Sequence, residues 1–261
     1  MIVERVWVGN RLRNYNYVVA CGETGEALAI DPLDHAACLR VAERRGFEIT
    51  QVLNTHEHHD HIGGNRGIVA ATGAKVLAHR DARIPGVDRG VGAGDVVRVG
   101  RTIELECLDT PGHTMSHVCL LAHAPEAALF SGDTLFNAGA GNCHNGGHPE
   151  VLYRTFAQQL ERLDAAAKLY PGHDYLAGNL RFTLDREPDN AAAAELLAAV
   201  DGRDGPDAPV LTLGQEKAIN TFFRLRSPSV VAALRRSFAD LPADPSDEDV
   251  FLRLRELRNR W

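Results

Sequence analysis

The first part of the chain alternates short apolar runs with turn residues, which is the pattern of a sheet with few helices. Most of these runs stop near glycine, proline or aspartate, residues that end strands and form turns. The runs predict strands at residues 5–8, 17–20, 27–30, 49–53, 75–78, 96–99, 103–108, 118–122, 128–130 and 168–170. Helices are expected between strands at residues 35–45 and 65–72, each closed by a glycine.

The later part of the chain changes character. Apolar residues at helical spacing, namely Leu152, Phe156, Leu160 and Leu163, mark the buried face of a helix expected over residues 150–166. Beyond residue 173 strand signals are few, and helices are expected at residues 179–187, 191–200, 230–239 and 248–261. We therefore expect two domains: a mixed β/α domain over residues 1–173 and a small helical domain over residues 174–261.

Composition narrows the possible partners. The 261 residues can bury a large core, and 44% of them are hydrophobic. A net charge of −7 disfavours a nucleic-acid partner, because phosphate binding needs a basic surface. No apolar run approaches the roughly 18–20 residues that span a bilayer, and the start lacks a signal-peptide layout, so no membrane partner is expected.

The five cysteines are odd in number and show no CxxC spacing. This pattern predicts free thiols in a reducing compartment, and therefore a cytoplasmic protein.

One stretch concentrates the chemistry: Thr55-His-Glu-His-His-Asp-His61, followed by Gly63-Gly64. His56 and His58 alternate, so on an extended segment they point the same way. Asp60 and His61 follow at once. Neutral imidazole and carboxylate are ligands that suit zinc, iron or manganese.

Three later segments each present one more ligand type just past a strand and beside a glycine. They are Thr110-Pro-Gly-His113, Ser131-Gly-Asp133 and Pro171-Gly-His173. The complete candidate set is His56, His58, Asp60, His61, His113, Asp133 and His173.

Seven ligands are too many for one tetrahedral ion, but they suit two divalent ions that share a carboxylate. We expect His56, His58 and His113 on one ion and Asp60, His61 and His173 on the other, with Asp133 between them. Zinc is the expected metal, with iron and manganese as alternatives. His117 is expected behind the metals, and His59 in an outer position or in solvent.

The motifs THxHxDHxGG, TPGHT, GDTLF and PGHDY resemble those of the metallo-β-lactamase-fold hydrolases, and within them the glyoxalase II, or hydroxyacylglutathione hydrolase, family. The likeness covers nearly the whole chain, and the helical tail is its more specific part. It includes Asn179-Leu-Arg-Phe182, Glu187-Pro-Asp-Asn190 and Ile219-Asn-Thr-Phe-Phe-Arg224.

The resemblance implies an α/β (α+β) fold, a four-layer αββα sandwich with a C-terminal helical domain that covers the thiol-binding side. It also implies hydrolysis of S-2-hydroxyacylglutathione, typically S-lactoylglutathione, to the hydroxy acid and glutathione. The family's metal ligands fall on the seven residues above. We expect a water between two metals to attack the thioester as hydroxide, with Asp60 and Asp133 fixing the metals and orienting the nucleophile.

The substrate-binding loop departs from the family. A lysine and aromatic residues usually follow GDTLF and bind glutathione, but Asn142 stands at the lysine position here. Tyr175 and Arg224 match thiol-binding positions, and Ser227 or Pro228 occupies a second basic position. The expected substrate contacts are Asn142, Cys143, His144, Tyr175 and Arg224.

Alternatives on the same fold are a hydrolase of another thioester or of a lactone, and a persulfide dioxygenase, which uses a single iron. Asp133 stands where common zinc β-lactamases carry cysteine, and the net charge disfavours a nuclease. A metal-stabilised binding protein without turnover is the alternative of a different class. The expected assembly is a monomer or a small homo-oligomer.

Overall fold

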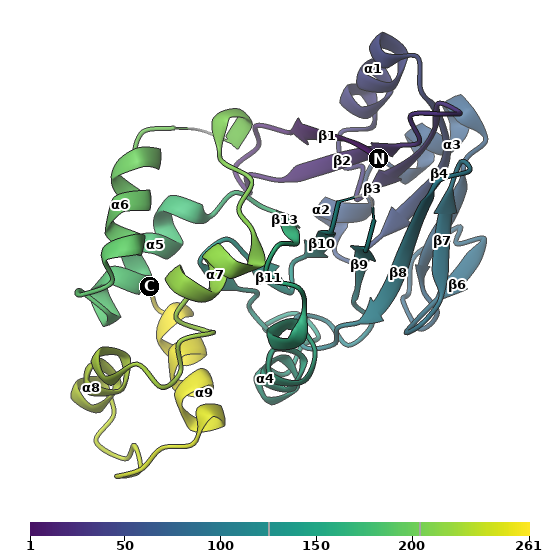
Figure 1. Ribbon diagram of the computed structural model, residues 1–261. Coiled ribbons are helices and arrows are strands. Elements are labelled where there is room, and N and C mark those ends of the chain that lie inside the picture. The colour runs from purple at the N-terminus through teal and green to yellow at the C-terminus, as the bar shows by residue number, and fades with distance from the viewer. Residues whose placement is uncertain (125, 204) are drawn as a thin grey trace.

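Two packed sheets form the centre of the protein in a computed structural model that describes residues 1–124, 126–203 and 205–261 (Figure 1). The first sheet has the order β1 (Ile2–Trp7), β2 (Tyr15–Ala20), β3 (Glu26–Ile30), β4 (Glu48–Asn54), β5 (Lys75–His79) and β6 (Arg89–Val91). The pairs β1–β2 and β2–β3 are antiparallel, while β3 to β6 run parallel. The carboxyl ends of β3 and β4 therefore lie at one edge.

The second sheet has the order β13 (Lys168–Pro171), β10 (Ala128–Gly132), β9 (Val118–Ala122), β8 (Ile103–Asp109) and β7 (Val96–Val99). Only the β10–β13 pair is parallel. Beside it, β11 (Leu135–Phe136) and β12 (Gly139–Ala140) form a small hairpin. Three candidate ligands follow strands of this sheet: His113 after β8, Asp133 after β10 and His173 after β13.

Apolar side chains from the facing sides of both sheets form the central core. Removing them from water supplies the main stabilisation of such a layer. The members include Tyr17, Leu28, Leu53, Leu105, Leu120 and Phe130. A second cluster joins the outer face of the first sheet to α1 (His35–Arg45) and α3 (Asn65–Thr72). The outer face of the second sheet packs against α4 (Pro149–Gln158). The αββα sandwich is thus confirmed.

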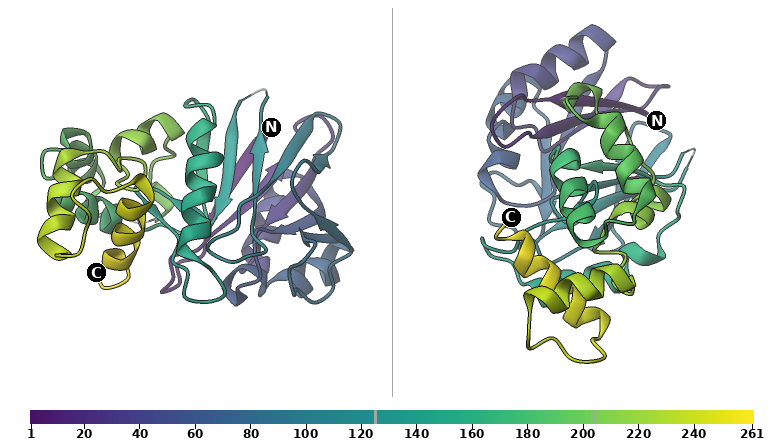
Figure 2. Two further views of the ribbon diagram at one scale, coloured as in Figure 1. Left: turned by 90° about the horizontal axis from the view of Figure 1, so that it is seen from below. Right: turned by 90° about the vertical axis from the view of Figure 1, so that its left-hand side faces the viewer.

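A helical region lies at one end of the sandwich and contains α5 (Leu176–Arg186), α6 (Ala191–Val200), α7 (Leu213–Ile219), α8 (Pro228–Ser237) and α9 (Asp247–Arg258). Figure 2 shows α4 between the strands and the C-terminal helices. One apolar cluster contains Leu129 of β10, Phe156 of α4 and Phe251 of α9, so the helices share a core with the second sheet. The domain boundary near residue 173 stays a prediction.

The helix expected over residues 150–166 is shorter than predicted. It ends at Gln158 and continues as a 3₁₀ turn, η1 (Leu160–Arg162). The Gln159 side-chain amide donates to the carbonyl of Asp109 at 2.7 Å and holds the chain back against β8. From there the chain has only a few residues to reach β13, which pairs with β10 at Lys168.

Several short elements are not predicted by the sequence pattern. Strands β6, β11 and β12 are too short to show a period, as are α2 (His59–Ile62) and the 3₁₀ turn η2 (Gly205–Asp207). Helix α7 did carry a signal: Thr212 and Gln215 form a capping box at its start. Over the described ranges, no helix combines the length and hydropathy needed to cross a bilayer.

Candidate metal centre

The histidine motif sits at the carboxyl end of β4, where a rigid strand supports the ligand loop. His56 lies in the loop, His58 precedes α2 in an extended conformation, and Asp60 and His61 lie within α2. The short helix carries Asp60 and His61, yet the ring of His61 still lies 4.1 Å from that of His56, centroid to centroid. The candidate ligands of the motif therefore stay close together.

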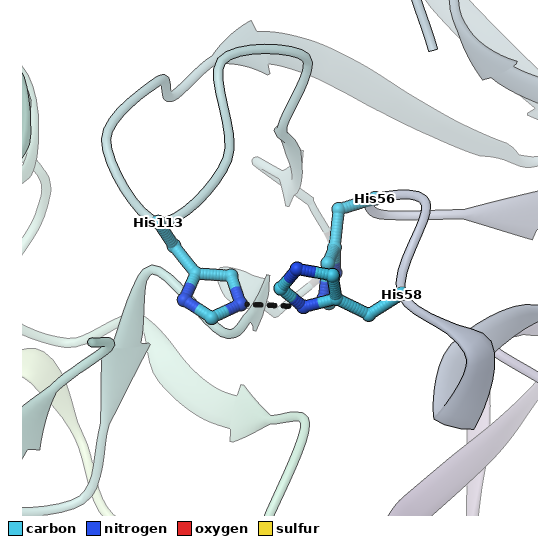
Figure 3. Close-up of side chains that lie close together, drawn as sticks. All are labelled: His56, His58 and His113. Atoms are coloured by element: carbon cyan, nitrogen blue, oxygen red, sulfur yellow. Dashed lines mark hydrogen bonds between the residues drawn. The ribbon is translucent and has the colours of Figure 1, made fainter. Parts of the chain in front are cut away.

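The first ligand group consists of His56, His58 and His113. His56 Nε2 lies 3.0 Å from His58 Nδ1, and His113 Nε2 lies 3.1 Å from the same atom. Figure 3 shows the His113 ring, from the loop after β8, pointing at the two rings of the motif. Two nitrogens at about 2.0–2.1 Å from a tetrahedral ion lie about 3.3 Å apart. This spacing matches a three-histidine metal site.

The second ligand group consists of Asp60, His61 and His173. His61 Nε2 lies 3.2 Å from His173 Nε2. Asp60 Oδ2 lies 3.6 Å from His61 Nε2 and 3.5 Å from His173 Nε2. Two imidazoles and one carboxylate converge here, whereas the first group consists of three imidazoles.

Asp133 lies between the groups. Its Oδ2 is 3.5 Å from His113 Nε2 and 3.1 Å from His173 Nε2, and its Oδ1 is 3.4 Å from His61 Nε2. Oδ1 is buried and lacks a hydrogen bond within the described part of the chain. Such an oxygen is costly unless a cation or donor satisfies it. The seven candidate ligands thus lie together, and the donor set fits divalent ions.

A glycine keeps the space around Asp133 open. A Cβ at Gly172 would lie 2.3 Å from Asp133 Oδ1 and 2.9 Å from His61 Cε1. Any side chain at this position would enter the space between the ligands, which explains the glycine before His173.

The second nitrogen of each ligand histidine is held by an oxygen acceptor, which selects the tautomer that turns a lone pair toward the other ligands. His113 Nδ1 donates to the Asn142 carbonyl at 2.6 Å, and His173 Nδ1 to the Leu12 carbonyl at 2.7 Å. The remaining pairs are His58 Nε2 with the Asn145 carbonyl, His56 Nδ1 with Thr55 Oγ1, and His61 Nδ1 with Asp31 Oδ2.

Two supporting residues were not predicted. Asp31 at the end of β3 accepts from His61 Nδ1 at 2.9 Å and from the Thr55 amide at 2.8 Å. Asn14 donates from Nδ2 to Asp60 Oδ2 at 3.0 Å. The only sequence signal for Asp31 was its position at a strand end beside β4. The role of Asn14 has no local signal.

His117 lies behind the ligands. Its ring stacks on His56 with centroids 5.2 Å apart, and its Nε2 accepts from the Asp133 amide at 3.2 Å. His59, between the ligands in sequence, is exposed.

At Asp133, His56 and His113 electrostatics favour the protonation states that metal ligands require, whereas His61 must release a proton to bind a metal. Burial opposes ionisation of Asp133, but His173 and His61 outweigh it and hold the pKa of Asp133 well below 3.8. Burial, aided by the charge of His61, holds the pKa of His56 well below 6.5, and burial lowers that of His113 to about 4. For His61, Asp133 and Asp31 overcome burial and hold the pKa well above 6.5.

The predicted substrate residues are spread around this centre. Tyr175 stacks on His173 with centroids 5.0 Å apart and an interplanar angle of 5°. Asn142 and His144 are exposed in the loop after β12, while Cys143 is half-buried against the helical cluster. All five cysteines are free thiols.

Arg224 is engaged elsewhere. Its Nε and Nη2 donate to the two carboxylate oxygens of Glu187 at 2.6 and 2.7 Å. Glu187 also accepts from Ser227 Oγ at 2.6 Å. This fork-to-fork pair ties the segment after α7 to the end of α5, and it engages two of the five N–H donors of Arg224.

Comparisons with known proteins agree with the geometry. Residues 10–173 match the metallo-β-lactamase superfamily, and residues 174–261 match the family described as hydroxyacylglutathione hydrolase C-terminus. The chain is 65% identical to a hydroxyacylglutathione hydrolase of Polaromonas sp. (strain JS666 / ATCC BAA-500) over 263 residues, which cover 100% of both chains. It is 59% identical to one of Nitrosococcus oceani over the same share.

Among solved structures, ETHE1 from Myxococcus xanthus superposes with a TM-score of 0.68 at 26% identity, covering 93% of each chain. The superfamily implies divalent metal ions, for which the His/Asp cluster supplies the ligands. Sequence, fold and ligand geometry together place the chain in the hydroxyacylglutathione hydrolase family of the metallo-β-lactamase superfamily.

Proposed function

We propose that this protein hydrolyses the thioester of an S-2-hydroxyacylglutathione, such as S-lactoylglutathione, to the 2-hydroxy acid and glutathione. One observation carries the proposal: two convergent ligand groups share the buried carboxylate Asp133. Relatives named hydroxyacylglutathione hydrolase support the substrate class.

Two divalent ions fit this arrangement, one held by His56, His58 and His113 and the other by Asp60, His61 and His173. Zinc suits the nitrogen-rich set, and iron and manganese accept the same ligands. Bound ions of this kind polarise a carbonyl and lower the pKa of water toward about 7.

The protein's own residues prepare the centre for that chemistry. Asp31 and the Asn142 and Leu12 carbonyls fix the ligand rings, so little reorganisation is needed during reaction. Asn14 orients Asp60 through one amide bond. A thiolate is a good leaving group, so the chain needs no dedicated general acid.

The thiol part of the substrate is proposed to lie between Tyr175 and the loop that contains Asn142, Cys143 and His144. Burial raises the pKa of Tyr175 above its usual range, so its phenol stays protonated and can donate a hydrogen bond. Arg224 belongs to the predicted contacts, but its bond to Glu187 favours a structural role. The free thiols support a reducing, cytoplasmic compartment.

The deciding experiment compares S-lactoylglutathione with S-lactoyl-N-acetylcysteamine, a thioester of the same acid whose thiol carries no carboxylates. Metal-replete protein is expected to hydrolyse the glutathione thioester with saturable kinetics and a clear preference. D133A is the matched inactive control. Failure of the wild-type protein to hydrolyse either thioester would refute the proposal.

A second candidate is a hydrolase of a different thioester, favoured by Asn142 at the family lysine position. Equal or faster turnover of the thioester without carboxylates would support this candidate. The number and identity of bound metal ions, measured by elemental analysis, separate both hydrolase candidates from a dioxygenase, which uses a single iron.

A further inference from the structure

A pocket of about 320 Å³ lies beside Tyr175. Its charged lining consists of Arg13, Arg181, Arg203, Arg258, Asp174 and Asp201. Arg13 pairs with Asp174 at 2.6 Å, and Arg181 pairs with Asp201. Among the described residues, four arginines face two aspartates in this lining, an excess of positive charge that suits an anionic group.

Arg258 is the distinctive member of this lining. It is half-buried at the end of α9 and donates from Nε and Nη2 to Asn179 Oδ1 at 3.3 and 3.1 Å. Across the residues that the structure describes, no carboxylate lies within ion-pair distance of its guanidinium. Burial lowers the pKa of Arg258, as expected for a cation that has lost water without gaining an anion.

The pocket adjoins the metal centre through Tyr175, which lines it and stacks on the ligand His173. Arg258 is tied to the same region: its partner Asn179 donates to the Asn137 carbonyl at 2.8 Å, beside the β11–β12 hairpin. Phe136 of that hairpin packs against Tyr175 with centroids 5.1 Å apart. Tyr175 therefore touches the candidate ligand His173 and also lines the pocket that contains Arg258.

We propose that the pocket between Tyr175 and Arg258 binds a carboxylate of the thiol part of the substrate, with Arg258 as its specificity-determining residue. This inference rests on the proposed function and deepens it. Glutathione carries carboxylates remote from its sulfur, and Asn142 offers no charge for them. A guanidinium in fork geometry binds carboxylate through charge-assisted hydrogen bonds.

The test measures kcat and KM of full-length, metal-replete R258Q, R258K and the control R260Q on both lactoyl thioesters. Arg260 is near Arg258 in sequence but pairs with Glu256 and is exposed. R258Q is expected to raise KM for S-lactoylglutathione about tenfold or more, the loss typical of one charge-assisted hydrogen bond. Turnover of the N-acetylcysteamine thioester should stay within about twofold, R258K should recover part of the loss, and R260Q should match the wild type.

A second readout separates binding from folding. Free glutathione should inhibit R258Q about tenfold more weakly than wild type, with metal content and thermal midpoint unchanged. Equal losses on both thioesters, or an unchanged KM for S-lactoylglutathione, would overturn the assignment of Arg258 while leaving the proposed function intact. Absence of thioesterase activity in the wild type would overturn both.

Discussion

The carboxylate of Asp31 accepts a hydrogen bond from Nδ1 of His61 at 2.9 Å, although the two residues lie 30 positions apart. Both are buried, and the same carboxylate also binds the amide and hydroxyl of Thr55. Three donors therefore point at one carboxylate. This arrangement turns His61 Nε2 toward the other ligands and connects β3 to the metal centre.

Replacing Asp31 by asparagine should weaken metal binding. The amide nitrogen of asparagine would face donors, so at least one of the three hydrogen bonds is lost. We expect metal affinity to fall about 10- to 100-fold, as for other residues that orient a ligand histidine. Chelator competition measures this loss. D81N, an exposed aspartate outside the site, is the control, and equal affinities of D31N and D81N would contradict the prediction.

Replacing Asp133 by asparagine should remove the shared ligand. One oxygen becomes an amide nitrogen that cannot coordinate a metal. We expect the metal content to fall from two ions per chain and the activity to fall by about 100-fold or more, since losing a ligand costs at least as much as losing a supporting residue. Elemental analysis measures the metal content, and thioester turnover measures the activity. Full activity with two ions retained would exclude a bridging role.

Glu216 in α7 should make stability depend on pH. Burial raises its pKa to about 7, while Asn137 Nδ2 and the Ala138 amide donate to its two oxygens at 2.7 Å each. The folded pKa lies above the unfolded value, so this group's contribution is complete below about pH 4.5 and is lost as pH rises toward 7. Over that window the loss is about 3 kcal/mol as an order of magnitude.

The variant E216Q tests this effect. The free energy of unfolding is measured with denaturant for metal-saturated wild type and E216Q at several pH values between 5 and 8. Subtracting the two values at each pH removes the contributions that both proteins share. The free energy of unfolding of the wild type should decrease relative to E216Q as pH rises. Parallel pH profiles would show that Glu216 does not titrate in this range.

Breaking the Arg224–Glu187 pair should destabilise the helical region. R224A leaves the buried Glu187 carboxylate without its cation; because Arg224 is 34% exposed and Ser227 still donates to Glu187, we expect a loss of about 1.5–3 kcal/mol. Unfolding measurements on R224A, E187A and the double variant give the coupling energy. Binding of glutathione by Arg224 predicts instead a raised KM for S-lactoylglutathione with little loss of stability.

Local patterns in the sequence determined most strands, most helices and the candidate ligands. His56 and His58 alternate within one loop, and His113, Asp133 and His173 each follow a strand beside a glycine. These are properties of a few neighbouring residues, so periodicity and turn chemistry reveal them. The resemblance of the motifs to a known family supplied the fold and the reaction class.

The tertiary structure decided how the candidate ligands are supported and which residues line the pocket beside Tyr175. Asn14 reaches Asp60 across 46 positions, and Asn137 reaches Glu216 across 79. The pocket next to Tyr175 likewise needs α9 to place Arg258. Such partners are chosen by strand order and helix packing, which bring distant segments together. Local spacing therefore identified the candidate metal ligands, while the fold selected the residues that orient them.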